Sequence, residues 1–135
     1  MQGRTDYTLA KRALLDEFRR GGLDRLQICD AHPELVRVAR NIGKPIPRPC
    51  PVCADEASLR SVRYVFGDQL KHLSGRPVYP DDWADELNAR YDEFRCYEIE
   101  VCVECLWNHL AACYLMGRSF NGSTTPAPKA VEQEG

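Results

Sequence analysis

Long hydrophobic runs are missing from this sequence, and no apolar stretch approaches the roughly 18–20 residues that a helix needs to cross a bilayer. No apolar segment follows the first six residues, so we expect no secretion signal and a cytoplasmic protein. Three enzyme motifs are also absent: a phosphate-cradling glycine loop, His-Glu-x-x-His and Gly-x-Ser-x-Gly. These absences favour a non-enzymatic protein without a membrane or an evident small-molecule substrate.

The sequence has little net charge, because its formal charge is only −2 over 135 residues. The charge is unevenly placed, however: residues 1–49 carry a balance of +4 and residues 50–117 a balance of −6. A basic N-terminal segment can meet an acidic partner or nucleic acid, or it can dock on the acidic segment of the same chain. Both interpretations stay open at this point.

Cysteine, by contrast, is plentiful, and four of the seven cysteines form two matched pairs. One pair is Cys50-Pro51-Val52-Cys53, the other is Cys102-Val103-Glu104-Cys105, and 48 residues separate them. Two such turns facing each other provide four thiolates in a tetrahedron, which is the ligand set of a structural zinc ion. The separation exceeds the common 15–20 residues, but the cost of closing a loop grows only with the logarithm of its length. We therefore predict a structural zinc site formed by Cys50, Cys53, Cys102 and Cys105.

Other chemistries for the paired cysteines are a thioredoxin-like redox pair, two disulfides, or reduced cysteines of a core. The odd number of cysteines and the lack of a secretion signal argue against disulfides. Four thiolates also bind iron, so the sequence does not distinguish zinc from iron. Outside the pairs, we expect Cys29 to be a core residue, Cys96 and Cys113 to be packed or partly exposed free thiols, and His32 to be a helix cap or a surface residue.

The first 49 residues are predicted to be helical. Residues 7–20 have an amphipathic pattern that Gly21-Gly22 ends, and residues 23–29 are long enough for two further turns. A third helix is expected to follow an Asp30 cap and to end at Gly43. Alternating prolines over residues 44–51 then favour an extended strut.

This helical segment also offers a weak signal for nucleic-acid binding. The expected order of a helix, a short helix and a third helix, joined by tight turns, resembles a helix-turn-helix. Arg37, Arg40 and Lys44 are placed where they could contact phosphates. Acidic residues at the start of the third helix argue against base contacts there. A solvent-exposed basic face is the alternative interpretation.

The following region predicts a small antiparallel sheet with an inserted helix. Residues 58–66 and 95–101 alternate as strands do, with Val62, Tyr64 and Phe66 on the buried face of the first. Residues 81–94 form the expected helix between them. Residues 106–116 fit a strand or a helix, and we favour a strand because the second cysteine pair would then lie at the tip of a hairpin.

The predicted organisation has three parts. Residues 1–49 form a helical segment with a proline-rich strut, residues 50–117 a four-cysteine zinc-ribbon-like unit, and residues 118–135 a tail. The tail is expected to be disordered, because it is polar and poor in large apolar side chains. The fold class is α+β, with the helical segment packed on the sheet.

Four segments in combination are similar to a family of small actinobacterial proteins of unknown function. They are the runs at residues 28–35, 50–53, 64–68 and 100–110, and the resemblance spans about residues 7–117. It implies a zinc-ribbon-like four-cysteine site carried by Cys50, Cys53, Cys102 and Cys105, and it implies no activity.

The sequence thus predicts a non-enzymatic zinc-binding protein that serves as a binding or regulatory module for a protein or nucleoprotein assembly. One alternative is a nucleic-acid-binding transcriptional regulator that uses Arg37, Arg40 and Lys44. A second alternative is a thiol redox or metal sensor.

Overall fold

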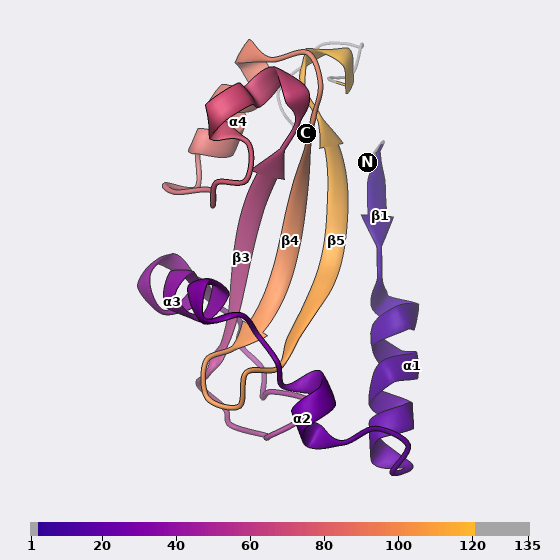
Figure 1. The fold of residues 1–135 in the computed structure, drawn as a ribbon. Helices are drawn as coiled ribbons and strands as arrows, with labels where there is room; N and C mark the ends of the chain where they lie inside the picture. Colours follow the sequence, from indigo (N-terminus) through magenta and orange to yellow (C-terminus); the bar gives the residue numbers. More distant parts are fainter. Residues whose placement is uncertain (1–2, 121–135) are drawn as a thin grey trace. The chain divides into compact units, whose positions relative to one another are not determined.

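The computed structural model describes residues 3–120 and confirms the α+β class (Figure 1). The strands are β1 (Arg4–Asp6), β2 (Lys44–Pro45), β3 (Leu59–Phe66), β4 (Phe94–Cys102) and β5 (Asn108–Met116). The helices are α1 (Thr8–Arg19), α2 (Arg25–Ile28), α3 (Pro33–Ile42) and α4 (Trp83–Arg90), with 3-10 helices η1 (Asp68–Leu73) and η2 (Arg118–Phe120). Most of the predicted tail, residues 121–135, lies outside the described residues, but residues 118–120 form η2. No helix among the described residues is long and apolar enough to cross a membrane.

The strands form one sheet in the order β1-β5-β4-β3-β2. Residues 108–116 are therefore a strand, as favoured from the sequence, and β4 and β5 form a hairpin around the second cysteine pair (Figure 1). At one edge, β2 pairs antiparallel with β3 through Lys44 opposite Ser61 and Pro45 opposite Arg60. A proline is compatible with this position because it belongs to an edge strand of only two residues.

Contacts group the chain into two compact units. The knuckle unit contains Asp6–Val62 and Glu98–Ala111, and the insert unit contains the described parts of Met1–Thr5, Arg63–Tyr97 and Ala112–Gly135. The strands β3, β4 and β5 each contribute a segment to both units. This grouping places the N-terminal helices together with both cysteine pairs, whereas the sequence suggested a boundary between residues 49 and 50.

The knuckle unit has a core that mixes apolar side chains with cysteines. Its buried members are Leu15, Ile28, Cys29, Cys50, Leu59, Cys102 and Trp107. The amphipathic pattern of α1 is confirmed by Leu15, with Leu14 and Phe18 packed against the same core, whereas Ala10 is exposed. The predicted Asp30 cap of α3 is wrong, because His32 is the N-cap and its Nδ1 accepts a hydrogen bond from the Glu34 amide at 3.0 Å.

The insert unit has an apolar core. Its buried members are Val65, Leu70, Val78, Ala84, Leu87, Phe94 and Cys96. The inserted helix is shorter than the predicted 81–94, because the chain turns after Tyr91 and Phe94 is already the first residue of β4.

The predicted buried face of β3 is also wrong in part. Leu59, Val62 and Val65 are buried, whereas Phe66 is 39% exposed. The reason is that β3 supplies Leu59 to the knuckle-unit core and Val65 to the insert-unit core, so its burial does not follow a single alternating face.

Candidate metal centre

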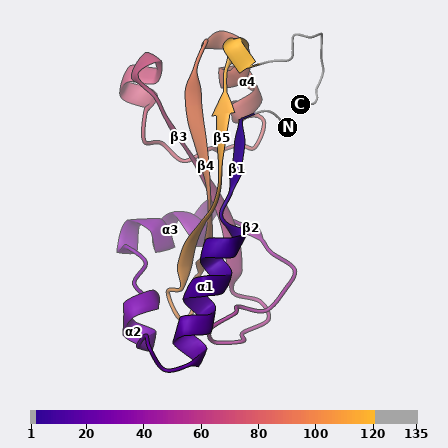
Figure 2. The ribbon, with the colours of Figure 1, turned by 90° about the vertical axis from the view of Figure 1, so that its right-hand side faces the viewer.

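Two loops of the knuckle unit bring the paired cysteines together. The first knuckle, residues 50–53, lies between β2 and β3, and the second knuckle, residues 102–105, begins at the last residue of β4. Figures 1 and 2 place the loop after β2 and the loop from β4 to β5 at the same end of the strands. The predicted ligands Cys50, Cys53, Cys102 and Cys105 thus meet, although the knuckles are separated by 48 residues in the sequence.

The spacing of the four sulfurs suits a tetrahedral metal ion. All four lie within 4.8 Å of one another. The Cys50 and Cys105 sulfurs are 3.7 Å apart, and so are the Cys53 and Cys102 sulfurs. A tetrahedron with zinc–sulfur bonds of about 2.3 Å has sulfur–sulfur edges of about 3.8 Å. The four-cysteine cluster therefore fits zinc, or another tetrahedral thiophilic ion, by donor type and by distance.

The two knuckles are closed by the same backbone hydrogen bond but differ in the amide that donates to sulfur. The Val52 amide donates to the Cys50 sulfur at 3.4 Å, and the Cys105 amide donates to the Cys102 sulfur at the same distance. Each loop is then closed by a backbone hydrogen bond between residues four positions apart. The Ala54 amide donates to the Cys50 carbonyl, and the Leu106 amide donates to the Cys102 carbonyl. The amides thus support the sulfurs as thiolates before any ion binds.

The residue after each knuckle has a left-handed backbone conformation. Ala54 has a φ of 65° and Leu106 a φ of 74°. Glycine adopts this region without cost, whereas a side chain costs about 1–2 kcal/mol. The same strain at equivalent positions indicates that the loop geometry, and with it the direction of both sulfurs, is imposed by the surrounding unit.

The thiols of the cluster differ in their acidity. Burial raises the pKa of Cys50 to about 11, despite hydrogen bonds from the knuckle amides. Burial also raises the pKa of Cys105. Burial acts in the same direction on Cys102, but hydrogen bonds to its sulfur outweigh burial and lower the pKa of Cys102 to about 7. These bonds come from the amides of Cys105 and Glu104 and from the Ser58 hydroxyl, which lies 3.0 Å from the sulfur. Cys102 is therefore the thiol that most readily provides a thiolate to an incoming ion.

Cys29 is a fifth cysteine beside the cluster. Its sulfur lies 3.6 Å from the Cys105 sulfur, and it belongs to the same buried core. The sequence correctly predicts a packed residue, but nothing local in it indicates this proximity. Arg25 lies beside the same two sulfurs, and its hydrogen bond with Cys29, aided by Cys105, raises the pKa of the guanidinium.

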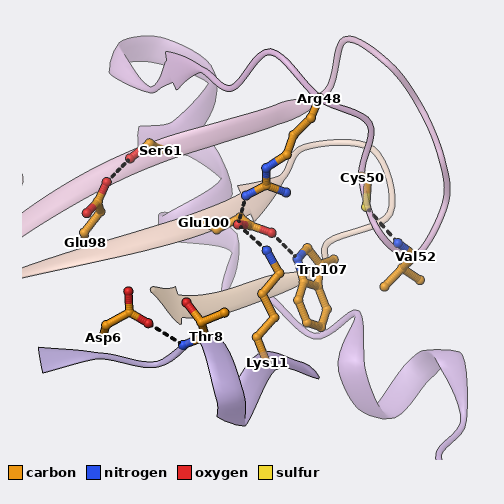
Figure 3. Close-up of polar contacts among 10 residues, drawn as sticks. All are labelled: Asp6, Thr8, Lys11, Arg48, Cys50, Val52, Ser61, Glu98, Glu100 and Trp107. Atoms are coloured by element: carbon orange, nitrogen blue, oxygen red, sulfur yellow. Dashed lines mark hydrogen bonds and ion pairs between the residues drawn. The ribbon is translucent and has the colours of Figure 1, made fainter. Parts of the chain in front are cut away.

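A buried carboxylate, Glu100, connects three parts of the knuckle unit (Figure 3). Its Oε1 accepts from Lys11 Nζ of α1 at 3.0 Å and from Arg48 of the proline-rich segment at 2.6 Å. Its Oε2 accepts from the indole nitrogen of Trp107, just after the second knuckle, at 2.9 Å. Burial favours the neutral acid, but Arg48, Trp107 and Lys11 outweigh it and hold the pKa of Glu100 below its ordinary value. The alternation of residues 95–101 assigned Glu100 to a polar face, so this network was missed.

Cys96, Cys113 and His109 lie outside the four-cysteine cluster. Cys96 and Cys113 are buried in the insert unit, as expected for packed thiols. His109 stacks on Trp107, with 6.0 Å between ring centroids, and hydrogen-bonds to the Tyr7 backbone. Burial lowers the pKa of His109, and its Nε2 is buried without a partner in the described part of the chain.

The basic residues predicted to bind nucleic acid lie in α3 and β2. Arg37 donates two hydrogen bonds to Glu34 one helical turn earlier, each of 2.7 Å. Arg40 donates to the Val103 carbonyl of the second knuckle at 3.1 Å. Lys44 lies in β2, where it pairs with Ser61. Arg37 and Arg40 therefore have side-chain contacts within the knuckle unit.

Comparisons with known proteins cover nearly the whole chain. A family model described as "Family of unknown function (DUF5318)" matches residues 2–130. Uncharacterized protein Rv0049 of Mycobacterium tuberculosis and Uncharacterized protein Mb0050 of Mycobacterium bovis are each 40% identical over 112 residues, which is 83% of this chain and 80% of each relative. No solved structure matches the chain. The range of the family model includes the four-cysteine cluster and Cys29.

Proposed function

The chain belongs to the DUF5318 family of unknown function, which has actinobacterial members, and we propose that it is a non-enzymatic zinc protein. The observation that carries this proposal is the cluster of four cysteine sulfurs within 4.8 Å of one another. Cys50, Cys53, Cys102 and Cys105 would hold the ion, and a reducing cytoplasm would keep these thiols available.

A zinc ion with four thiolate ligands has no open position for a substrate or a water molecule, so its contribution is structural. The free energy of binding such an ion acts as folding free energy, because the unfolded chain lacks the preformed site. Here the ion would join the loop before β3 to the tip of the β4–β5 hairpin.

The role we propose for the folded unit is a binding or regulatory module for a protein or nucleoprotein assembly. Support comes from Leu9 of α1 and Leu26 of α2, which are 76% and 80% exposed although both belong to the knuckle unit. We propose that these two side chains belong to the surface that contacts the partner.

The metal proposal is tested by elemental analysis of the freshly purified chain, followed by circular dichroism with and without a strong chelator. We expect one zinc ion per chain and a loss of ordered structure when the ion is removed. One iron ion per chain would keep the structural role and change the metal. A chain purified without metal, or one whose structure survives metal removal, would contradict the proposal.

The binding proposal is tested by affinity capture from an actinobacterial extract, using the zinc-loaded chain as bait before and after nuclease treatment. We expect a specific protein that the double variant Leu9→Glu, Leu26→Glu no longer captures, with zinc content unchanged. The matched control is Arg19→Glu, an exposed change on α1. Capture that is abolished by nuclease and falls steeply with salt would favour nucleic-acid binding instead.

A further inference from the structure

The fifth cysteine, Cys29, is held against the four-cysteine cluster by the protein chain. Its amide donates to the Arg25 carbonyl at 2.9 Å, which fixes it at the end of α2. Two residues later, the Ala31 amide donates to the Leu106 carbonyl at 3.0 Å, next to Cys105. These backbone bonds on either side keep the Cys29 and Cys105 sulfurs 3.6 Å apart without requiring an ion.

The two cysteine residues differ in their exposure to solvent. Cys105 is partly exposed, whereas Cys29 is 9% exposed and belongs to the buried core. Arg25 lies beside both sulfurs and supplies positive charge at the pair. A small oxidant can therefore reach Cys105 first, and the neighbouring thiol is the one that a tetrahedral ion does not use.

We propose that Cys29 and Cys105 form a peroxide-sensitive pair in which Cys29 resolves the oxidised Cys105 as a disulfide and thereby releases the metal. This inference rests on the proposed zinc site. It assigns a modification site to Cys29, which has no role in the structural zinc site itself.

The reaction with hydrogen peroxide balances in two steps. The Cys105 thiolate attacks one peroxide oxygen, the O–O bond breaks, and hydroxide leaves, so that Cys105 becomes a sulfenic acid. The Cys29 sulfur then loses its proton, attacks the Cys105 sulfur and displaces the sulfenic oxygen as hydroxide, which that proton converts to water. Two sulfurs are each oxidised by one electron, and peroxide is reduced to water and hydroxide.

Disulfide formation removes Cys105 from the ligand set, so that Cys50, Cys53 and Cys102 are the cluster thiols left for the ion. Three thiolates bind zinc more weakly than four, so the ion is released. A dithiol reductant restores both thiols and the full ligand set.

The test treats the zinc-loaded full chain with hydrogen peroxide and follows two readouts: zinc release to a chromophoric indicator and disulfide mapping by peptide mass spectrometry. The variants are Cys29→Ser and, as a matched buried-thiol control in the insert unit, Cys113→Ala. We expect a Cys29–Cys105 disulfide with a mass loss of about 2 Da in the wild type and in Cys113→Ala, reversed by reductant. In Cys29→Ser we expect over-oxidation of Cys105 in place of a disulfide, and a loss of zinc binding that the dithiol reductant no longer reverses.

Three results would overturn the inference. One is a set of wild-type disulfides that joins only the four cluster cysteines, and this readout needs no variant. A second is a peroxide-treated Cys29→Ser chain that regains zinc binding with reductant as fully as the wild type does. A third is a Cys29→Ser chain that folds but no longer binds zinc, because Cys29 would then be a ligand. Failure of the zinc proposal itself is distinguishable, since the untreated wild type would then contain no zinc.

Discussion

The knuckle unit and the insert unit achieve burial with different chemistry. The buried residues of the insert unit are almost all aliphatic or aromatic, and Trp83 and Tyr91 pack against them. The buried set of the knuckle unit contains Cys29, Cys50 and Cys102 among its apolar members, and beside them lies the buried carboxylate Glu100. One core can be completed by hydrophobic burial, whereas the other gathers sulfurs that become thiolates together only when a cation binds between them.

This contrast indicates which unit should depend on a metal ion. Residues distant in sequence, from α1 to the second knuckle, meet around the four-cysteine cluster and Glu100. In the insert unit, the buried residues of α4 and η1 are apolar, and Leu70 and Leu87 are completely or almost completely buried. A metal ion should therefore control the knuckle unit first.

The largest expected effect comes from removing a metal ligand. Cys102 is fully buried, and Cys102→Ser should abolish stoichiometric zinc binding and destabilise the knuckle unit by an amount on the order of 10 kcal/mol, the scale of a structural zinc site. Metal analysis and urea unfolding measure both quantities. The control Cys113→Ala removes a buried thiol of the insert unit and should retain one zinc per chain. Equal zinc loss in both variants would contradict the assignment of metal binding to the knuckle unit.

A cavity in the insert unit should have a large effect without any involvement of metal. Leu87 is fully buried, so Leu87→Ala should cost about 2–5 kcal/mol in the free energy of unfolding. Zinc content should stay at the wild-type level. Exposed Leu9→Ala is the control and should change stability by less than about 0.5 kcal/mol. A Leu87→Ala chain that loses zinc while its insert unit stays folded would contradict the proposal that metal binding depends on the knuckle unit alone.

The pH dependence of zinc affinity reports how many thiols of the knuckle unit are protonated before the ion binds. The thiol pKa of Cys50 is raised to about 11 and that of Cys105 is also raised, so zinc must displace protons from both near neutral pH. At least two released protons imply an affinity that rises at least about 100-fold per pH unit just above pH 7. Competition with a chromophoric chelator at several pH values measures this slope. An affinity independent of pH in this range would show that the thiols were already ionised.

The Glu100 network should contribute less than the metal but more than a surface ion pair. Glu100→Gln keeps the shape and loses the charge, so we expect a cost of about 1.5–3 kcal/mol, the range for hydrogen bonds to charged groups. Arg48 is about half exposed, and this argues for the lower end. Leu9→Gln, an exposed change in the same unit, is the control.

The pH behaviour of this loss has a definite sign. Because the folded pKa of Glu100 is lowered, its contribution is complete above the ordinary unfolded value of about 4.3 and is lost as pH falls through the folded value. The difference between Glu100→Gln and the wild type should therefore stay constant from about pH 5.5 to 8, as urea unfolding at several pH values can show. A difference that disappears between pH 8 and 6 would contradict the lowered pKa.

The smallest expected effect concerns the strained residue after the first knuckle. Ala54 has a φ of 65°, so Ala54→Gly should stabilise the zinc-loaded chain by about 0.5–1 kcal/mol. Ala57→Gly in the same loop is the matched control, because Ala57 is not among the described residues with a positive φ, and it should be neutral or destabilising. Thermal unfolding distinguishes the two variants, and equal shifts would argue against strain at Ala54.

The local features of this fold could be predicted from the sequence. The extent of α1, the strand at residues 108–116 and the hairpin around the second knuckle follow from periodicity and from the cysteine spacing. The meeting of the four cysteines was predicted because each Cys-x-x-Cys turn directs two sulfurs to one side, and the cluster confirms that they lie together.

Features that depend on tertiary contacts could not be predicted in this way. Glu100 occupies a polar position in an alternating strand, and only the arrival of Lys11 and Arg48 from distant segments makes its burial favourable. Cys29 resembles an ordinary core residue, because its neighbour Cys105 is 76 positions away. The end of α4 was misplaced since the apolar spacing continues to Phe94, which belongs to the next strand.

The most direct test of the account is amide hydrogen exchange, measured by mass spectrometry on the zinc-loaded chain and after chelation. The reporters are the peptides covering α1 and α2 for the knuckle unit and those covering α4 for the insert unit. Metal removal should accelerate exchange in α1 and α2 by at least about tenfold more than in α4. Unchanged exchange in α1 and α2, or equal acceleration in both units, would contradict the claim that a metal ion completes the knuckle unit.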